Sequence, residues 1–146
     1  MSHARSKARQ CLVQALYEWQ MSGSALSQIE ADFLANPHNK NMEAGFFKKL
    51  LHAIPKGTNE LDDHLSKVLD RKVDELDLVE KAILRLGVYE LLHKPEVPYR
   101  VVINEGVELA KVFGADKSHR YINGVLDKMA SALRATEIKM KKKKPK

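Results

Sequence analysis

The sequence predicts an all-α protein folded as one bundle-like domain, and three observations lead to this class. Apolar residues recur at spacings of three and four along most of the chain, as on one face of a helix. No segment alternates convincingly with the period of two that a half-buried strand shows. The chain has 146 residues, without an internal repeat or a linker long enough to divide it. That length suits a single domain with one hydrophobic core.

Four helices are predicted in the first half of the chain. In order, the expected elements are a helix over about 4–20, a loop over 21–27, a short helix over 29–34, a loop over 35–42, and helices over 46–54 and 61–69. Pro55 separates the last two helices. Because proline lacks a backbone N–H and clashes with the preceding turn, we expect a stop or a kink there.

Three longer helices are predicted in the second half. Their apolar stripes run over 76–92, 102–113 and 122–133, and a segment with two prolines separates the first two. Gly114 has the position of a C-cap, and Ser118 has that of an N-cap for the last helix. The middle helix of the three has the broadest apolar face, so we expect it to be central and buried.

The net charge of +6 is unevenly distributed. The segment 139–146 carries six lysines and residues 1–9 carry three cations, each without an acid, so residues 10–138 have a net charge of −3. Blocks of like charge are typical of disordered tails that attract polyanions. We therefore expect a folded domain over 1–138 and a disordered, lysine-rich tail over 139–146, either solvated or in contact with a polyanion.

Recognisable catalytic chemistry is absent from the sequence. It contains no phosphate-binding loop, dinucleotide fingerprint, nucleophile elbow or close histidine pair. Cys11 is the single cysteine, and its place beside an apolar stripe predicts a buried, structural thiol. No apolar run approaches the ~20 residues of a membrane span, and the basic N-terminus lacks the apolar core of a secretion signal. We expect no catalysis, cofactor or metal, and a reducing, cytoplasmic setting.

Two segments have the residue types of a nucleic-acid contact. The first is the start of the chain, with Arg5, Lys7 and Arg9. Arg5 and Arg9 are four residues apart, so on a helix they lie on one side and can follow a phosphate backbone; a solvated helix start is the alternative. The second segment combines a turn, a helix N-terminus, cations and an aromatic. Its candidate residues are Asp116, Lys117, Ser118, His119, Arg120 and Tyr121.

Two features stay open between binding and packing. Tyr121 lies one helical step from the apolar residue Ile122, so its ring either stacks on an unpaired base or packs at the edge of the core. A strip of the first helix, away from its apolar stripe, suits either a protein interface or a second layer of the bundle. This strip consists of Gln10, Gln14, Tyr17 and Met21.

Four segments carry a pattern shared with known proteins. They are RSKARQCLVQALY at 5–17, EKAILRLGVYEL at 80–91, VPYRVVINEGVELAK at 97–111 and FGADKSHRYINGVLDK at 113–128. Through them the sequence resembles the bacterial NusB family of transcription antitermination factors, over about residues 4–134. The resemblance implies an all-helical fold of two packed helical bundles, and no catalysis.

The resemblance also implies partners. Proteins of this family bind the boxA element of ribosomal RNA leader transcripts together with NusE, a ribosomal small-subunit protein. The pair joins other Nus factors on RNA polymerase and suppresses premature termination. We expect the same partners for this chain, no membrane, and a possible homodimer, since some relatives dimerise.

The family's contact residues carry over by position. Its RNA-binding arm matches Arg5, Lys7 and Arg9, and its second RNA-binding region matches 116–121, with the aromatic at Tyr121. For NusE, the matching positions are Tyr17, Asp74 and Glu80. Acidic groups suit such an interface, because a ribosomal protein partner is usually basic.

Three positions depart from the family pattern. Pro55 lies where relatives usually continue a helix, and Lys117 lies where an acid is frequent. A cation at that position is expected to strengthen a phosphate contact or alter RNA preference. Gly106 replaces a more usual alanine, which costs ~1 kcal/mol of helix stability unless close packing requires the glycine.

Other functional classes fit parts of the pattern. Some ribosomal RNA cytosine methyltransferases carry a similar helical domain at the N-terminus. If the chain is a full-length product, its end at Lys146 leaves no room for a methyltransferase domain; if it is a fragment, this alternative stays open. A helix-turn-helix protein would bind duplex DNA at least as well as boxA RNA. A pure protein scaffold would bind NusE without any gain in RNA affinity.

Overall fold

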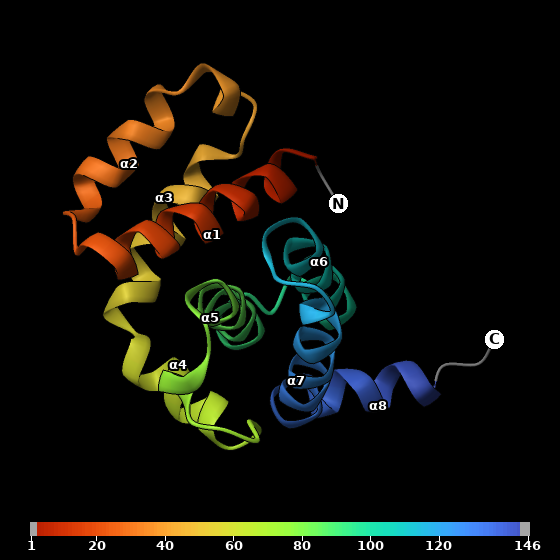
Figure 1. The fold of residues 1–146 in the computed structure, drawn as a ribbon. Coiled ribbons are helices and arrows are strands. Elements are labelled where there is room, and N and C mark those ends of the chain that lie inside the picture. Colours follow the sequence, from red (N-terminus) through yellow and green to blue (C-terminus); the bar gives the residue numbers. More distant parts are fainter. Residues whose placement is uncertain (1–2, 144–146) are drawn as a thin grey trace.

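The computed structural model describes residues 3–143, and side chains up to residue 140. Within that range it contains eight α-helices, two 3₁₀ turns and no strand. Figure 1 shows how the helices are arranged. The elements are α1 (His3–Ser22), α2 (Leu26–Ala35), η1 (Pro37–Asn39), α3 (Ala44–Lys56), α4 (Thr58–Ser66), η2 (Val73–Glu75), α5 (Leu78–His93), α6 (Tyr99–Phe113), α7 (Ser118–Leu133) and α8 (Ala135–Lys143). The predicted all-α class is confirmed.

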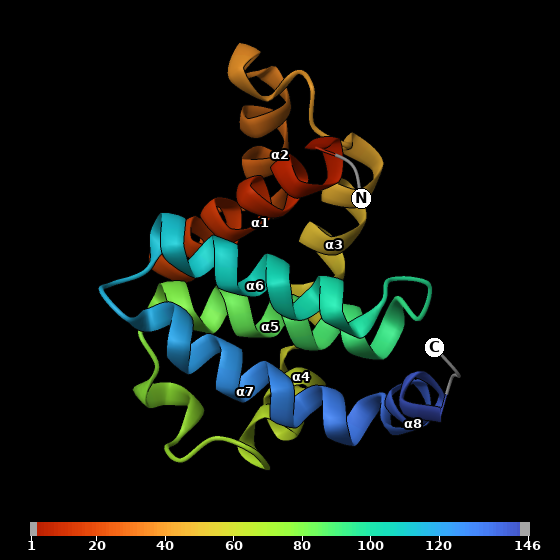
Figure 2. The same ribbon diagram turned by 90° about the vertical axis from the view of Figure 1, so that its right-hand side faces the viewer.

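The helices form two packed groups around α5. The first group is α1, α2 and α3, and the second is α4 to α7. Figure 1 shows α5 end-on in the middle, and it packs against α1, α3, α4, α6 and α7. In Figure 2, α5, α6 and α7 lie side by side. The helix α1 packs obliquely against α6 and runs in the same general direction. The expected pair of helical bundles is therefore present.

The central helix is α5, which corrects the prediction that α6 holds this place. Buried residues cover most of the circumference of α5, because helices of both groups pack against it, and between residues 81 and 91 only the stripe through Lys81, Arg85 and Tyr89 is half-buried. By contrast, α6 keeps Asn104, Glu108 and Lys111 exposed. A broad apolar face predicts burial of that face, and it leaves open which helix of a layer lies between the others.

Close packing of α5, α6 and α7 depends on two glycines. Leu126 of α7 lies between them: a Cβ at Gly106 would lie 2.6 Å from its Cδ1, and a Cβ at Gly87 would lie 2.7 Å from its Cδ2. Both distances are too short for real contacts, so an alanine at either position would displace Leu126. At Gly106, which departs from the family pattern, the close packing against Leu126 thus depends on the absence of a side chain.

Several element boundaries differ from the prediction. Pro55 lies inside α3, which ends at Lys56, one residue after the predicted stop. The helix α4 ends at Ser66, so it contains Leu61 and Leu65 of the predicted stripe, whereas the last two apolar residues of that stripe, Val68 and Leu69, follow the helix. The predicted helix over 76–92 begins only at Leu78, because the Asp77 side chain accepts a hydrogen bond from the backbone N–H of Glu80 and caps it.

The N-cap prediction for Ser118 is wrong. The N-cap of α7 is Lys117, which adopts a left-handed conformation with φ of 66°. Ser118 is the first residue of the helix, and its side chain is buried. Its hydroxyl donates to the Glu80 carboxylate at 2.9 Å rather than accepting from its own helix. A residue other than glycine rarely holds a left-handed conformation, so the turn before α7 is strained at Lys117.

The end of the fold is held by Arg134 and Glu137. The buried Arg134 guanidinium donates to carbonyl oxygens around the C-terminus of α5, namely those of Glu90, Leu91, Lys94 and Val97, at 2.9–3.2 Å. Glu137 accepts from Arg134 at 2.6 Å and from the backbone N–H of Tyr99, the first residue of α6, at 3.0 Å. Residues 134–137 therefore supply hydrogen-bond partners to the C-terminus of α5 and to the N-terminus of α6.

The lysine-rich segment begins inside a helix. Residues 139–143 of this segment belong to α8, and residues 144–146 lie outside the described residues. Within the described range, no helix is long and apolar enough to cross a bilayer.

Candidate nucleic-acid interface

The inner face of α1 holds Arg9 inside the protein. Its guanidinium donates to both carboxylate oxygens of Glu90 at 2.8 and 2.9 Å, and to Glu105 at 2.7 Å. The Arg9 side chain is only 1% exposed. Burial acts to lower the pKa of Arg9, but the hydrogen bonds and charges of the two glutamates outweigh it and raise that pKa. Arg9 therefore joins α1 to α5 and α6, and its charge is not presented to solvent as a phosphate contact would require.

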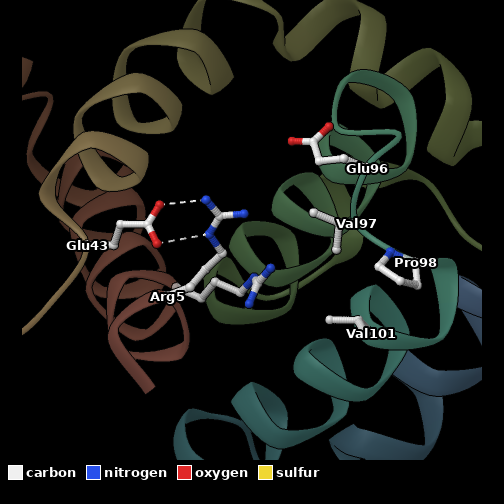
Figure 3. Close-up of a pocket in the computed structure, with 7 residues that line it drawn as sticks. Arg5, Glu43, Glu96, Val97, Pro98 and Val101 are labelled. Atoms are coloured by element: carbon white, nitrogen blue, oxygen red, sulfur yellow. Dashed lines mark hydrogen bonds and ion pairs between the residues drawn. The ribbon is translucent and has the colours of Figure 1, made fainter. Parts of the chain in front are cut away.

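Arg5 is also paired, although it is partly exposed. Its guanidinium forms two hydrogen bonds with Glu43, at 2.6 and 3.3 Å, and lies 4.4 Å from the centre of the Phe46 ring. The hydrogen bond from Arg5 holds the pKa of Glu43 below its usual range. Figure 3 shows this pair at the side of a cavity of about 310 Å³. The cavity is lined by Arg5, Arg9, Glu43, Glu96, Val97, Pro98 and Val101.

Lys7 lies on the other face of α1. It is half-buried, and among the described residues no hydrogen bond or ion pair engages its ammonium group. The expected basic cluster is thus divided: the helix brings Arg5 and Arg9 together on the inner face and separates Lys7 from them. Among the residues that the structure describes, Lys7 is the one of these three cations that pairs with no carboxylate.

The turn between α6 and α7 carries the second set of predicted contacts. Gly114 is the C-cap of α6, in an extended conformation, and a Cβ there would lie 2.7 Å from the Ala110 carbonyl oxygen. Because the backbone turns this tightly at Gly114, only residues 114–117 separate α6 from α7. Asp116, Lys117 and Arg120 are exposed, and His119 is half-buried. Ser118 faces inward, so it shapes the turn rather than offering its hydroxyl to a ligand.

Tyr121 is neither fully buried nor free. Its hydroxyl donates to Asp70 at 3.2 Å, and the Arg71 guanidinium lies 4.4 Å from the centre of its ring. Burial raises the pKa of the Tyr121 hydroxyl, while the Arg71 hydrogen bond lowers that of Asp70. Arg71, which sequence reasoning did not single out, thus places a planar cation on an aromatic ring.

The predicted partner contacts lie near this turn. Tyr17 is 39% exposed, Asp74 is exposed in η2, and Glu80 is half-buried in the first turn of α5, where it accepts from Ser118. Tyr17 lines a hollow of about 280 Å³ with side chains of α1, α5 and α6. These neighbours are Val13, Gln14, Val79 and Phe113. The end of α6 and the second half of α1 therefore share one surface.

The two predicted nucleic-acid segments lie at opposite ends of α6. Arg5 shares its cavity with Val101 in the first turn of α6, whereas Ser118 follows the last turn (Figure 2). The fifteen residues of α6 span about 22 Å. A ligand that contacts both ends must therefore be extended. Within the described residues, no group of three or more metal-ligating side chains is present.

Sequence reasoning missed the carboxylates that bind the arginines. Glu90 and Glu105 lie 81 and 96 residues from Arg9 along the chain, so no local pattern connects them. One local signal was available: Arg9 precedes Leu12 by three residues and Leu16 by seven, which places it on the apolar stripe. A cation in such a position indicates a buried ion pair.

Comparison with known proteins assigns this arrangement to one family. The sequence model of the NusB family matches residues 6–131. The transcription antitermination protein NusB of Alcanivorax borkumensis is 56% identical over 134 residues, which cover 92% of this chain and 89% of that protein. The protein of the same name from Pseudomonas savastanoi is 49% identical, covering 97% of this chain and 86% of its own length.

Solved structures agree with the sequence matches. NusB of T. maritima has a TM-score of 0.77 and 27% identity, covering 90% of this chain and 93% of that one. NusB in a crystal structure of antitermination factors NusB and NusE in complex with double-stranded RNA has a TM-score of 0.76 and 28% identity, covering 90% and 99%. The family match spans most of the chain, and sequence and fold point the same way. This chain is a member of the NusB family.

Proposed function

We propose that this protein is a transcription antitermination factor that binds boxA RNA of ribosomal RNA leader transcripts together with NusE. The observation that carries the proposal is the 56% identity, over 92% of the chain, to a transcription antitermination protein. The likeness to NusB in a complex with NusE and RNA, at a TM-score of 0.76, supports both partners. In this role the protein joins other Nus factors and RNA polymerase.

The RNA surface consists of the exposed cations and the aromatic at the two ends of α6. Lys7, Lys117 and Arg120 are accessible to phosphates, and the half-buried Tyr121 is the candidate for a contact with a base. Asp116 and His119 supply further polar groups at the turn. Arg5 belongs to this surface as a partly exposed cation that is paired with Glu43. Arg9 and Ser118 act as positioning residues, because both side chains are bonded inside the fold.

The NusE surface consists of Tyr17, Asp74 and Glu80 around the start of α5. Acids and an exposed aromatic suit a basic protein partner. Residues 10–138 carry a net charge of −3, which favours attraction to such a partner at long range. Because the NusE and RNA surfaces meet at the turn after α6, binding of one partner is coupled to binding of the other, and the coupling is reciprocal.

The role involves no catalysis by this chain, and it places the protein in the cytoplasm, where transcripts are made. The alternative of a methyltransferase domain has less support. The two relatives named above are antitermination proteins, and they are matched over 89% and 86% of their own lengths.

Fluorescence anisotropy tests the proposal. Labelled boxA RNA, a scrambled RNA of equal length and a duplex RNA are titrated with the protein, with and without NusE, at two salt concentrations. We expect preference for boxA that strengthens when NusE is present. Equal binding to all RNAs, unaffected by NusE and lost at high salt, would contradict the proposal and indicate a polycation effect. Binding of NusE without a gain in RNA affinity would indicate a protein scaffold.

A further inference from the structure

The last helix of the described chain, α8, carries a dense group of cations. Its nine residues, Ala135–Lys143, include four lysines and one acid, Glu137. Glu137 is already bonded to Arg134 at 2.6 Å. Lys139 is exposed, and the backbone continues as a helix through residues 141–143, which are all lysine. This excess of positive charge lies outside residues 6–131, which the family model matches.

The start of α8 is fixed to the rest of the fold, so its lysines are held at a defined place. Arg134, the residue before α8, donates to the carbonyl oxygen of Val97 at 3.0 Å. Glu137 accepts from the backbone N–H of Tyr99 at 3.0 Å, and Ile138 packs against the hydrophobic core. The four lysines that follow therefore belong to a helix whose first turn is anchored beside the first residue of α6.

This anchor brings α8 to the end of α6 at which Arg5 lies. The connection from α5 to α6, residues 94–98, lies between them. Val97 accepts from Arg134 through its carbonyl oxygen and also lines the cavity beside Arg5. The one acid of this connection, Glu96, is paired with Lys94 at 3.3 Å. In Figure 2 the start of α1, this connection and α8 lie toward the same side of the molecule.

We propose that α8 is a second RNA-binding element, which binds the phosphodiester backbone of the nucleotides that flank boxA, where the transcript leaves the start of α1. The inference rests on the proposed function, and it adds an element and an RNA segment that the surface at the two ends of α6 does not include. The lysine ammonium groups bind phosphate oxygens as point charges. Residues 135–143 include no aromatic side chain that could stack on a base, so the contact does not depend on the sequence of the flank.

Composition and position favour RNA over a lipid surface as the partner of α8. A helix that lies on a membrane needs a large apolar face. Among the described side chains of α8, Ile138 packs inward, which leaves Met140 as the exposed large apolar residue. An RNA strand that is already held at the start of α1 is present beside α8 at a high effective concentration. Individually weak phosphate contacts then add to the affinity of the whole complex.

The test uses boxA RNA in three lengths. These are the minimal element, the element extended by about eight nucleotides of mixed sequence at its 5′ end, and the same extension at its 3′ end. Binding in the presence of NusE is measured by fluorescence anisotropy across a salt series. The α8 variant replaces all four lysines of the helix by glutamine, which preserves helix propensity. Its substitutions are Lys139→Gln, Lys141→Gln, Lys142→Gln and Lys143→Gln.

Two control variants separate a local contact from a loss of net charge and from a structural role of the lysines. The first removes the same charge elsewhere, at four exposed lysines of α3 and the end of α4, by Lys48→Gln, Lys49→Gln, Lys56→Gln and Lys67→Gln. The second replaces the four lysines of α8 by arginine, which keeps the charge. Circular dichroism confirms that each variant is folded.

We expect one of the two extended RNAs to bind the wild type about tenfold more tightly than the minimal element does, and the α8 variant to lose this gain. On that RNA the salt slope should fall by about 0.7 for each lost phosphate contact, hence by about 2 for three contacts. On the minimal element, the α8 variant should change binding no more than the first control does. Both controls should keep the gain from the extension.

Three results would overturn the inference. If neither extension increased the affinity of the wild type, or if the gain survived in the α8 variant, α8 would not hold the flanking RNA. If the α8 variant weakened binding of all three RNAs equally, its lysines would act as a non-specific polycation. Vesicles that contain phosphatidylserine form a separate arm. Binding to them that requires the lysines, without a gain from either extension, would assign α8 to a lipid surface.

A failure of the proposed function gives a different result. The wild type would then show no preference for the minimal boxA element over a scrambled RNA of equal length in the presence of NusE. In each of the results that overturn only the role of α8, that preference remains.

Discussion

Lys7 and Arg9 lie two residues apart on α1, and the fold uses them in opposite ways. Arg9 is 1% exposed and bonded to Glu90 and Glu105, so its charge stabilises the contact between the two helical groups. Lys7 lines a groove of about 350 Å³ between α1 and the connection from α2 to α3. No carboxylate is among its described lining residues, so the charge of Lys7 faces outward. The comparison teaches that the face of the helix, rather than membership of a basic segment, decides whether a cation supports the fold or meets a ligand.

The largest effect is expected from removing the inner cation. Arg9→Ala leaves two carboxylates without their partner, one of them buried, and should reduce the free energy of unfolding by about 3–5 kcal/mol. Lys7→Ala, on the outer face, should change it by no more than about 0.5 kcal/mol. Urea unfolding followed by circular dichroism measures both. Equal losses in the two variants would break the comparison.

A similar comparison between an inner and an outer position can be made with two glycines, Gly106 of α6 and Gly124 of α7. Gly106→Ala would place a Cβ 2.6 Å from Leu126 and should destabilise the protein by about 1–3 kcal/mol. Gly124 lies on the exposed side of α7, where an added Cβ meets nothing within 4 Å, so Gly124→Ala should stabilise by about 0.5–1 kcal/mol. Thermal unfolding of both variants checks the sign. Stabilisation by Gly106→Ala would show that Leu126 moves aside without cost.

A smaller effect is expected at Asp70, on the surface beside Tyr121. Hydrogen bonds from Arg71 and Tyr121 hold the pKa of Asp70 below its usual range. Because the folded-state pKa is lowered, Asp70 stabilises the fold at neutral pH, and this contribution is lost as pH falls through that pKa. Asp70→Asn should therefore lower Tm slightly at about pH 7 and by a smaller amount at about pH 2. An equal difference in Tm between Asp70→Asn and the wild type at both pH values would show that the carboxylate charge is not involved.

Much of the fold could be predicted from local spacing. The stripe through Ala8, Leu12 and Leu16 gave α1 its buried face, and Cys11 is buried beside it, where burial raises the pKa of its thiol. Boundaries failed where a single side chain decided them. Asp77 is the N-cap that fixes the start of α5, and the left-handed Lys117 takes the N-cap position of α7 in place of the expected Ser118.

The candidate site was harder to predict, because its groups are sorted by contacts distant in sequence. Spacing correctly placed Arg5 and Arg9 on one side of a helix, but Glu43, Glu90 and Glu105 made that side the inner one. The accessible strip with Gln10, Gln14, Tyr17 and Met21 was recognised as a possible interface. The sequence could not show that His38 lines one groove with Lys7, because η1 approaches α1 only through the packing of α2 and α3.

The segment after α7 sets a practical limit on how this protein can be shortened or fused. The family match ends at residue 131, yet Arg134 and Glu137 satisfy the exposed ends of α5 and α6. A chain cut at the family boundary would lose both and leave backbone carbonyls of α5 without a donor. Affinity tags, fluorescent fusions and cross-linking handles at this end therefore belong beyond Ile138, where they leave the bonds between α7, α5 and α6 intact.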